Sequence, residues 1–539
     1  MSVSFPEYFN LADYYLFDRL EEGLKDKKAI LFGDRSWTYG EVAKKTEKLR
    51  SWMHDNGVQK EQRVLIILPD TPPFAWSIFA TLANGSVVAM GNPDAATKDL
   101  AYVLEYTRAT VVITIPRVAE DLKQQFSDSD SLKRLLLVPE VETFDDPEKN
   151  IEIPPSLQQS CETVTALSDI VNNDKSQSVN SGAHSKNKRD DVAFWLFTSG
   201  STGNPKAAVH THRDFAFNTE LYAKNTVGYQ PDDITVSIPR LYFGYATGTN
   251  LLFPFAVGAT SGLFSEHPTP TALTHYIKHY QATVVTNVPT MLGKILEYDG
   301  EIDLSSVRFH LSAGEALPPT LMQRFTDRFN QDVYDGIGSA EMFHIYCTNR
   351  PGDIKPGSLG KVVDGYEIRI LPEDADSPGA SPLAPGETGV MWVKGDSIAQ
   401  CYFQDREKSW ETFFGHWCRT GDLFKLDEDG YLYFVGRSGD NFKVSGIWVS
   451  PIEVEECLLQ HPAVSLCCVI PVQVEGLTKS KAIVVLRDEH RGQDLEDELQ
   501  QHVKSNLSRY KYPRQIEFVD DLPKNDRGKI NRKLLIAQG

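Results

Sequence analysis

The sequence lacks the features that would place it among secreted, membrane or zinc-binding proteins. Its seven cysteines are scattered and include no CxxC pair, which favours reduced thiols in the cytoplasm over a disulfide framework or a zinc site. No run approaches the ~18 apolar residues that a membrane helix needs. The first residues show no basic stretch followed by an apolar one, so we expect no signal peptide and no association with a membrane.

The sequence also has no excess of positively charged residues. The 539 residues include 55 Lys and Arg against 74 Asp and Glu, and the formal net charge of −19 argues against nucleic-acid binding. An acidic protein that binds anions must use local cations and backbone amides instead of its overall field. The hydrophobic content of 41% is ordinary for a globular protein, and a chain of this length is expected to form more than one domain.

What the sequence does contain is a repeated alternation of short apolar runs with helix-like segments. Three stretches show it, at 63–85, 282–298 and 307–329, and a fourth at 332–347 is interpreted as a strand, a glycine turn and a helix. This alternation predicts an α/β fold with mostly parallel sheets that helices cover on both faces. Ligands bind such folds at the carboxyl ends of strands, where the loops of these stretches lie.

The pattern changes in the last third of the chain. After about residue 386, alternating runs that turn at Asp-Gly predict hairpins. A helix should begin after Ser450, which we expect as its N-cap, with Pro451 in the first turn and Glu453 completing a capping box. We place a domain boundary at 437–440, with a small α+β domain after it, and we predict that the polar segment 171–190 is a mobile loop.

The stretch TSGSTGNPK at 198–206 follows an apolar run and combines four hydroxyl side chains, two glycines and a lysine. Glycines let backbone amides approach an anion, hydroxyls donate to phosphate oxygens, and Lys206 adds positive charge. The pattern does not fit the Walker A loop GxxxxGK[ST]. We therefore predict a phosphate-binding loop of another kind.

This loop resembles the phosphate loop of the acyl-adenylating superfamily, which contains acyl-CoA synthetases, adenylation domains of peptide synthetases and luciferases. Four more motifs of that family are matched in the same order: YDGIGSAE at 334–341 (adenine and magnesium), RTGD at 419–422 (ribose), GRSGDNFKVSGIWVSPIEVE at 436–455 (hinge) and PKNDRGKINR at 523–532 (terminal lysine). The segments LYFGYATGTN, DGIGSAEMFHI and KVSGIWVSP are most similar to the benzoate-CoA ligase branch.

The resemblance implies a fold and a reaction. The fold is a large N-terminal domain over 1–436 with a small β-barrel-like subdomain, a hinge at 437–440 and a mobile lid domain over 441–539. The reaction activates a benzoate-type acid (benzoate, aminobenzoate such as anthranilate, or hydroxybenzoate) as acyl-AMP with release of pyrophosphate. The acyl group then passes to the thiol of CoA. The implied cofactors are ATP, Mg²⁺ and CoA, and the enzyme would act as a monomer or homodimer.

The resemblance also assigns roles to individual residues. Lys529 would be catalytic, and Glu341 would be catalytic and hold magnesium. The positions implied for ATP or AMP are Thr198, Ser199, Gly200, Ser201, Thr202, Gly203, Lys206, Ala313, Gly314, Glu315, Asp335, Gly336, Ile337, Asp422, Phe434 and Arg437. Those implied for the aryl substrate are Tyr242, Phe243, Gly244, Tyr245, Gly336, Gly338 and His344, with the glycines forming a flat pocket floor. Those implied for CoA and the hinge are Gly439, Lys443, Gly446 and Trp448.

Two positions depart from the family pattern. Gly439 stands where the family usually has an Asp or Lys hinge, and Ala340 stands where it usually has a Thr that contacts the α-phosphate. Three alternatives therefore stay open: transfer to the phosphopantetheine of an acyl carrier protein, an adenylate-binding protein without turnover, and a generic P-loop NTPase, which the absent Walker pattern disfavours. The ring substituent also stays open, because hydrophobic pockets discriminate such differences only modestly.

Overall fold

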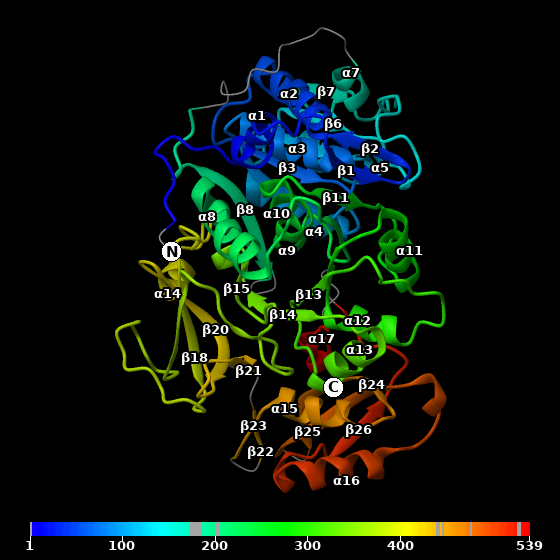
Figure 1. Ribbon diagram of the computed structural model, residues 1–539, viewed down its shortest axis with the longest axis vertical. Helices are drawn as coiled ribbons and strands as arrows, with labels where there is room; N and C mark the ends of the chain where they lie inside the picture. The colour runs from blue at the N-terminus through cyan, green and yellow to red at the C-terminus, as the bar shows by residue number, and fades with distance from the viewer. Residues whose placement is uncertain are drawn as a thin grey trace.

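The fold is taken from a computed structural model that describes residues 3–172, 186–199, 204–437, 442–444, 447–474, 477–524 and 530–538. Two large sheets form the body of the protein (Figure 1). The seven-stranded sheet has the order β7 (Thr163–Ala166), β6 (Arg134–Leu137), β5 (Val111–Thr114), β3 (Arg63–Ile67), β4 (Val87–Met90), β8 (Val192–Ser199) and β9 (Pro205–Thr211). Only its β8–β9 pair is antiparallel.

The nine-stranded sheet lies beside it and carries the positions predicted for the aryl substrate, together with 313–315, 335–337 and 341. Its order is β16 (Lys361–Val362), β15 (Ile345–Thr348), β14 (Val333–Gly338), β13 (Phe309–Ala313), β12 (Val284–Asn287), β10 (Ile234–Ser237), β11 (Thr260–Leu263), β1 (Lys28–Phe32) and β2 (Arg35–Thr38). The central pairs are parallel, and antiparallel pairs occur only at the two ends.

Helices cover these sheets, which explains why the strands are apolar on both faces. They are α1 (Asp18–Glu21), α2 (Tyr39–Asp55), α3 (Pro72–Ala83), α4 (Thr97–Thr107), α5 (Pro116–Asp121), α6 (Lys123–Asp128), α7 (Leu167–Val171), α8 (His212–Asn218), α9 (Gly244–Thr247), α10 (Phe253–Ala256), α11 (Pro270–Tyr280), α12 (Pro289–Leu296) and α13 (Pro319–Phe329), with π-helical turns η1 (Asp13–Phe17), η2 (Thr219–Val227) and η3 (Gly248–Leu252). Helix α3 is buried along its whole length, and its Phe79 ring lies 5.1 Å from that of Phe255 in α10. Strong apolarity all round is expected of a helix enclosed in this way.

A smaller antiparallel sheet follows, as the alternating runs predicted. It contains β17 (Glu367–Leu371), β18 (Gly389–Lys394), β19 (Phe413–Phe414), β20 (Trp417–Leu426) and β21 (Leu432–Arg437), with α14 (Arg406–Thr412) against it. Strands β20 and β21 form the expected hairpin, which turns at residues 427–430 with Gly430 at φ +81°.

The last part of the chain forms its own sheets and hydrophobic clusters. These contain β22 (Phe442–Val444), β23 (Ile447–Val449), α15 (Pro451–Leu459), β24 (Val464–Val474), β25 (Leu477–Leu486), η5 (Asp488–His490), α16 (Glu496–Asn506), η6 (Arg509–Lys511), β26 (Gln515–Phe518) and α17 (Arg532–Gln538). Figure 1 shows most of this part in orange and red below α12 and α13, with α17 level with those two helices in this view. Arg487 there forms an ion pair of 2.7 Å with Glu297, at the end of α12.

Three predictions about local structure need correction or limits. The helix predicted within 332–347 is wrong, because a short 3-10 turn η4 (Ala340–Met342) leads into strand β15. The capping box after Ser450 is also wrong, because the Ser450 hydroxyl donates to the Val435 carbonyl at 2.9 Å and the Glu453 carboxylate accepts from Lys511 at 2.5 Å. The predicted mobile segment lies mainly outside the described residues.

The described part of the chain bears on two further expectations. None of its helices is both long and apolar enough to cross a membrane. All seven cysteines lie within it, and none of them forms a disulfide bond with another.

Candidate active site

The site is built at the carboxyl ends of neighbouring parallel strands, as such folds require. In β13 and β14, Ser312 lies beside Asp335 and Ala313 beside Gly336. The segments 313–315 and 335–337, both implied for ATP or AMP, are therefore adjacent. Gly314 then turns with φ +91°, a conformation that favours glycine. Glu315, also predicted to contact the nucleotide, has a structural role, because its carboxylate accepts from the backbone and hydroxyl of Thr290 at 3.0 and 2.7 Å.

Asp335 has unusual electrostatics. Its side chain is 3% exposed, and burial raises its pKa to about 8, although the hydroxyl of Ser312 and the backbone of Gly336 act in the opposite direction. No described residue is hydrogen-bonded to its Oδ1 atom. A carboxyl group that holds its proton near neutral pH can donate as well as accept, which fits the mixed donor and acceptor edge of adenine.

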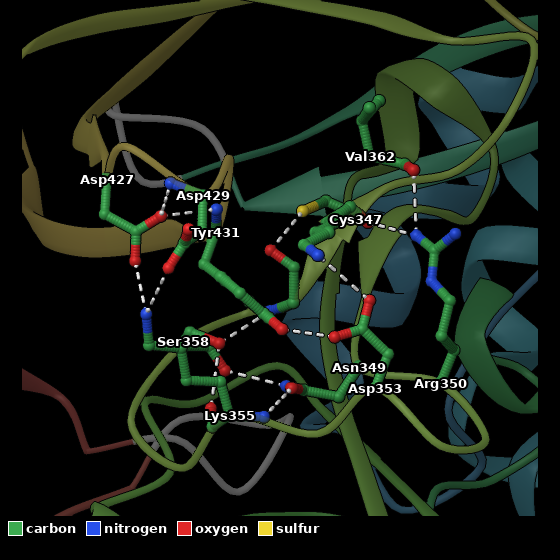
Figure 2. Close-up of polar contacts among 12 residues, drawn as sticks. Cys347, Asn349, Arg350, Asp353, Lys355, Ser358, Val362, Asp427, Asp429 and Tyr431 are labelled. Carbon is green, nitrogen blue, oxygen red and sulfur yellow. Dashed lines mark hydrogen bonds and ion pairs between the residues drawn. The ribbon is translucent and has the colours of Figure 1, made fainter. Parts of the chain in front are cut away.

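A polar network centred on Asn349 lies next to Asp335, and Figure 2 shows the part of it that joins Asn349, Ser358, Lys355 and Asp427. The side chain of Asn349 donates to the carbonyls of Asp335 and Ser358, at 3.0 and 2.8 Å, and accepts from the backbone of Lys355 at 2.8 Å. The Lys355 ammonium continues to Asp427 at 2.7 Å, in the turn between β20 and β21. The network therefore connects the strand that contains the predicted adenine motif with the sheet that contains the predicted ribose motif.

The two predicted ribose ligands lie together in that sheet. Asp422 in β20 is the register partner of Arg437 in β21, so residues 15 apart in the sequence become neighbours. Phe434, on the same strand as Arg437, packs against Phe424 with ring centroids 5.3 Å apart.

Glu341 and Lys206, which lie far apart in the sequence, meet around Tyr402. The Tyr402 hydroxyl donates to Oε1 of Glu341 at 2.6 Å, and the Lys206 ammonium lies 5.8 Å from the centre of the Tyr402 ring. Burial and the neighbouring Glu341 raise the pKa of Tyr402, so the phenol keeps its proton and donates it. Lys206 also pairs with Asp405 at 2.6 Å and holds the pKa of that carboxyl below its usual value. The predicted phosphate lysine and magnesium carboxylate therefore share one corner of the site.

These groups fit magnesium bound together with phosphates. Within the described ranges, no group of three or more His, Cys, Asp and Glu side chains could hold a metal alone. No described residue bonds to the second carboxylate oxygen of Glu341, which leaves a hard oxygen for a hard cation. Mg²⁺ usually binds through one or two carboxylates, substrate phosphates and water, so this arrangement suits it.

Ala340, the position where the family usually has Thr, packs on a small apolar cluster. Its partners are Ala208, Ala399, Tyr402 and Phe413. Its carbonyl accepts from Nε2 of His210 at 2.6 Å. The backbone at this position is therefore fixed by a side chain from β9.

Four of the predicted aryl-binding residues, 242–245, follow β10, and Tyr245 lies against His344, whose ring also contacts two residues that were not predicted, Phe253 and Tyr222. The rings of Tyr245, Phe253 and Tyr222 lie 5.3, 4.7 and 5.5 Å from that of His344, and those of Tyr242 and Phe243 are 4.6 Å apart. Burial lowers the pKa of His344 to about 3, so its ring is neutral. Its Nε2 atom donates to the Tyr245 carbonyl at 3.0 Å, which leaves Nδ1 as an acceptor with no partner among the described residues.

The flat pocket floor predicted from Gly336 and Gly338 needs correction. A Cβ at Gly336 would lie 2.7 Å from the Cys347 carbonyl oxygen, and one at Gly338 would lie 2.5 Å from the His344 carbonyl oxygen. These glycines therefore allow β15 to approach β14. The glycine that makes room for the His344 ring is Gly248, where a Cβ would lie 2.6 Å from it. Gly244 faces the side chain of Leu196 instead.

Several predicted residues lie where the structure gives limited information. Gly200, Ser201, Thr202, Gly203, Gly439, Gly446 and Lys529 lie outside the described residues. Ser199, Arg437, Lys443 and Trp448 are described by their backbone alone, while Thr198 is paired with Lys206 in the β8–β9 ladder and Ile337 with Cys347 in the β14–β15 ladder.

Four residues in or behind the site were not identified from the sequence. Tyr402, Asp405, His210 and Asn349 belong to none of the five motifs. Tyr402 bonds to a residue 61 positions away and His210 to one 130 positions away. Such long-range contacts leave no local pattern of spacing that could have identified them.

Comparison with known proteins agrees with this arrangement. The chain matches "AMP-binding enzyme" over residues 17–403 and "AMP-binding enzyme C-terminal domain" over residues 453–529. The chain belongs to the AMP-binding enzyme family. This confirms the superfamily that the five motifs resembled, and the fold class predicted from it.

Relatives that are similar to this chain over nearly its whole length include ligases named for aromatic acids. Benzoate–CoA ligase from Thauera aromatica is 36% identical, with 98% of this chain and 96% of that protein covered. The structure of the anthranilate CoA ligase AuaEII in complex with anthranoyl-AMP has a TM-score of 0.88, with 31% identity and coverage of 99% and 98%. A benzoate CoA ligase from Burkholderia xenovorans LB400 has a TM-score of 0.85, with 34% identity and coverage of 98% and 100%. The resemblance to the benzoate-CoA ligase branch is therefore confirmed.

Proposed function

We propose that this protein is an ATP-dependent aryl-CoA ligase. It activates a benzoate-type carboxylic acid as acyl-AMP, releases pyrophosphate, and transfers the acyl group to the thiol of CoA. The observation that carries the proposal is the meeting of Glu341 and Lys206 around Tyr402, with Glu341 directly after β14, the strand that contains Asp335. The family and its relatives that use aromatic acids support the same conclusion.

The first half-reaction joins two anions, so positive charge must be placed where they meet. An oxygen of the acid forms a bond to the α-phosphorus, and the bond from that phosphorus to pyrophosphate breaks. Lys206 would compensate phosphate charge, and Glu341 would hold magnesium, which supplies further positive charge when it is bound. Lys529 would bridge the carboxylate and the α-phosphate.

The second half-reaction needs an acceptor thiolate. Its sulfur forms a bond to the acyl carbon, and the bond from that carbon to the AMP oxygen breaks, so AMP leaves with its electron pair. We propose that the domain after the hinge at 437–440 rotates about Gly439 between the two steps. Lys443, Gly446 and Trp448 would then line the path of the CoA thiol.

The proposed acid site explains why a planar ring is preferred. Tyr222, Tyr245 and Phe253 surround His344, and an aromatic enclosure favours a flat ring over a long acyl chain. Two buried polar atoms there, Nδ1 of His344 and the hydroxyl of Tyr245, have no partner among the described residues. A hydroxyl or amino group on the ring would satisfy them, which supports a substituted benzoate among the candidate acids.

Two features bear on the surroundings in which the enzyme works. We propose that it acts in the cytoplasm, because its cysteines form no disulfide bonds with one another. We propose free CoA as the acceptor, since the relatives include CoA ligases, and a monomer or homodimer as the active form.

The test is pyrophosphate release with ATP, magnesium and a panel of acids, each with and without CoA. The panel contains benzoate, 2-aminobenzoate, 4-hydroxybenzoate, cinnamate, hexanoate and phenylalanine. We expect release that requires an aryl acid and is accelerated by CoA. If CoA does not change the rate of pyrophosphate release but a phosphopantetheinylated carrier protein does, the acceptor is the carrier protein and not free CoA. Release of ADP, or binding of adenylate without any pyrophosphate release, would contradict the proposal.

A further inference from the structure

The turn that presents Glu341 is held by groups from other parts of the chain. Three consecutive carbonyls in η4 accept hydrogen bonds from distant residues. The Ala340 carbonyl accepts from His210 at 2.6 Å, that of Glu341 from the backbone of Ala399 at 2.8 Å, and that of Met342 from the Ser397 hydroxyl at 2.8 Å. The shape of the turn therefore depends on its surroundings.

The backbone after Glu341 is strained, so this support is needed. Phe343 has φ +67° and ψ −59°, and the backbone of His344 donates to the Met342 carbonyl at 2.9 Å, which is the geometry of a rare γ-turn. The Phe343 ring stacks on Phe215 of α8 with centroids 3.5 Å apart. A residue other than glycine adopts these backbone angles only where the surrounding structure imposes them.

His210 makes the shortest of these three hydrogen bonds, and the orientation of its ring is fixed. The residue is fully buried at the end of β9, and its ring meets Phe215 edge-on at 5.7 Å. A carbonyl oxygen can only accept, so Nε2 must carry a proton toward Ala340. Nδ1 faces Oδ2 of Asp214 at 3.2 Å, and Asp214 also accepts from the backbone and hydroxyl of Thr211 at 2.8 and 2.6 Å. The ring therefore cannot flip without losing both contacts.

We propose that His210 is a positioning residue for the magnesium carboxylate. It holds the Ala340 carbonyl, so that the next residue, Glu341, keeps its carboxylate at Tyr402 and toward the phosphates. His210 touches neither the substrate nor the proposed metal and acts through the backbone of η4. The inference rests on the proposed function of Glu341.

The test compares two amide side chains at this position. The amide nitrogen of Gln reaches about where Nε2 lies, whereas that of Asn reaches only the place of Nδ1. For His210→Asn we expect the magnesium concentration that half-saturates binding of a non-hydrolysable ATP analogue to rise about tenfold, as for one lost hydrogen bond. AMP binding without magnesium should change less than about twofold, and His210→Gln should recover most of the loss. Titration calorimetry measures both equilibria without turnover.

His212 provides the matched control. It is equally buried two positions away, but its Nδ1 accepts from the backbone of Leu11, near the N-terminus, and contacts nothing in η4. His212→Asn should lower the melting temperature without moving the magnesium dependence. Glu341→Gln is a second control, because it should itself raise the magnesium requirement. It therefore tests the proposed role of Glu341 separately from the role of His210.

Two results would overturn the inference. The first is a normal magnesium requirement in His210→Asn while Glu341→Gln raises it. The second is a loss in His210→Gln equal to that in His210→Asn, with AMP binding reduced to the same extent, because a general structural role would then explain both. No effect of Glu341→Gln on the magnesium requirement would instead contradict the proposed role of Glu341.

Discussion

The turn that carries Glu341 and the domain after the proposed hinge are held in opposite ways. The turn is enclosed by hydrogen bonds from β9 and from residues 397, 399 and 402, and by the stacked rings of Phe343 and Phe215. The C-terminal domain has its own hydrophobic clusters. Its described polar contacts with the body include the ion pair Arg487–Glu297 and the hydrogen bond from Ser450 to Val435.

This difference matches what two successive half-reactions require. Binding and charge placement for ATP need a corner of the site that is already built before the substrate arrives. Replacing pyrophosphate by an acceptor thiol requires that one part of the protein can move away from the site between the two steps. A partly exposed ion pair costs little to break, about 0–1 kcal/mol, whereas the buried turn would lose several contacts at once.

The largest effect should come from Lys529, in the domain that we propose to rotate. Lys529→Ala should slow formation of acyl-AMP by about 10²–10³-fold, the usual cost of removing one electrostatic stabiliser of the transition state. Thioester formation from synthetic acyl-AMP should change far less, because the role proposed for Lys529 belongs to the first half-reaction only. Lys524→Ala is the control, since Lys524 lies on the same segment but pairs with Asp521 at 3.1 Å. Equal losses in both half-reactions would contradict the assigned role.

The next effect tests the prebuilt corner. Tyr402→Phe removes the hydroxyl that donates to Glu341, and a hydrogen bond to a charged group is worth about 1.5–3 kcal/mol. We expect the KM for magnesium-ATP to rise about tenfold or more in steady-state kinetics, with the KM for the acid unchanged. Tyr106→Phe is matched to it, because the Tyr106 hydroxyl donates to the Phe403 carbonyl at 2.5 Å, behind the site. The same KM shift in both variants would make the effect structural.

A third effect is a pH dependence set by Asp335. Its pKa is raised to about 8 in the folded protein, so its contribution to stability is fully present below pH 4 and is lost as the pH rises through 8. Relative to Asp335→Asn, the wild type should lose up to about 1.4 kcal/mol of unfolding free energy per pH unit within this window. Denaturant unfolding at several pH values between 5 and 8 measures the difference. Parallel pH profiles for the two proteins would rule out an abnormal pKa at Asp335.

The smallest effect should come from the contact between the two regions. Arg487→Gln or Glu297→Gln removes a partly exposed ion pair and should change the ratio of the two half-reaction rates by about fivefold or less. The exchanged pair Arg487→Glu with Glu297→Arg should restore it. Rapid-quench measurement of each half-reaction would show this. A change of a hundredfold would mean that the domain after the hinge is fixed as firmly as the turn.

Much of the body could be predicted from local patterns. The strands β3 and β12, the helices α3 and α12, and the hairpin of β20 and β21 lie where apolar runs, prolines and Asp-Gly turns placed them. The prediction failed within 332–347, because the positive φ of Phe343 ends any helix there and residues 345–348 pair with β14 instead. It failed again at Ser450, whose hydroxyl bonds to Val435 in β21 and not to its own helix.

The residues of the candidate site also fall into two groups, those that lie in sequence motifs and those that only the folded chain brings together. Asp335, Glu341, Lys206 and Asp422 stand in motifs, and the sequence located them. Tyr402, His210 and Asn349 act through contacts between distant segments, so only the folded chain shows them. The pocket glycines were misinterpreted for a related reason, because the direction of a missing side chain depends on which strand lies opposite.

One measurement tests the proposed acyl-adenylate most directly: the fate of ¹⁸O from the acid. The enzyme is given an aryl acid labelled at both carboxylate oxygens, with ATP, magnesium and CoA, and the AMP is analysed by mass spectrometry. We predict one ¹⁸O in AMP for each thioester formed, because the acid oxygen that bonds to the α-phosphorus leaves with AMP. Label in inorganic phosphate together with ADP, or thioester formation with unlabelled AMP, would contradict it.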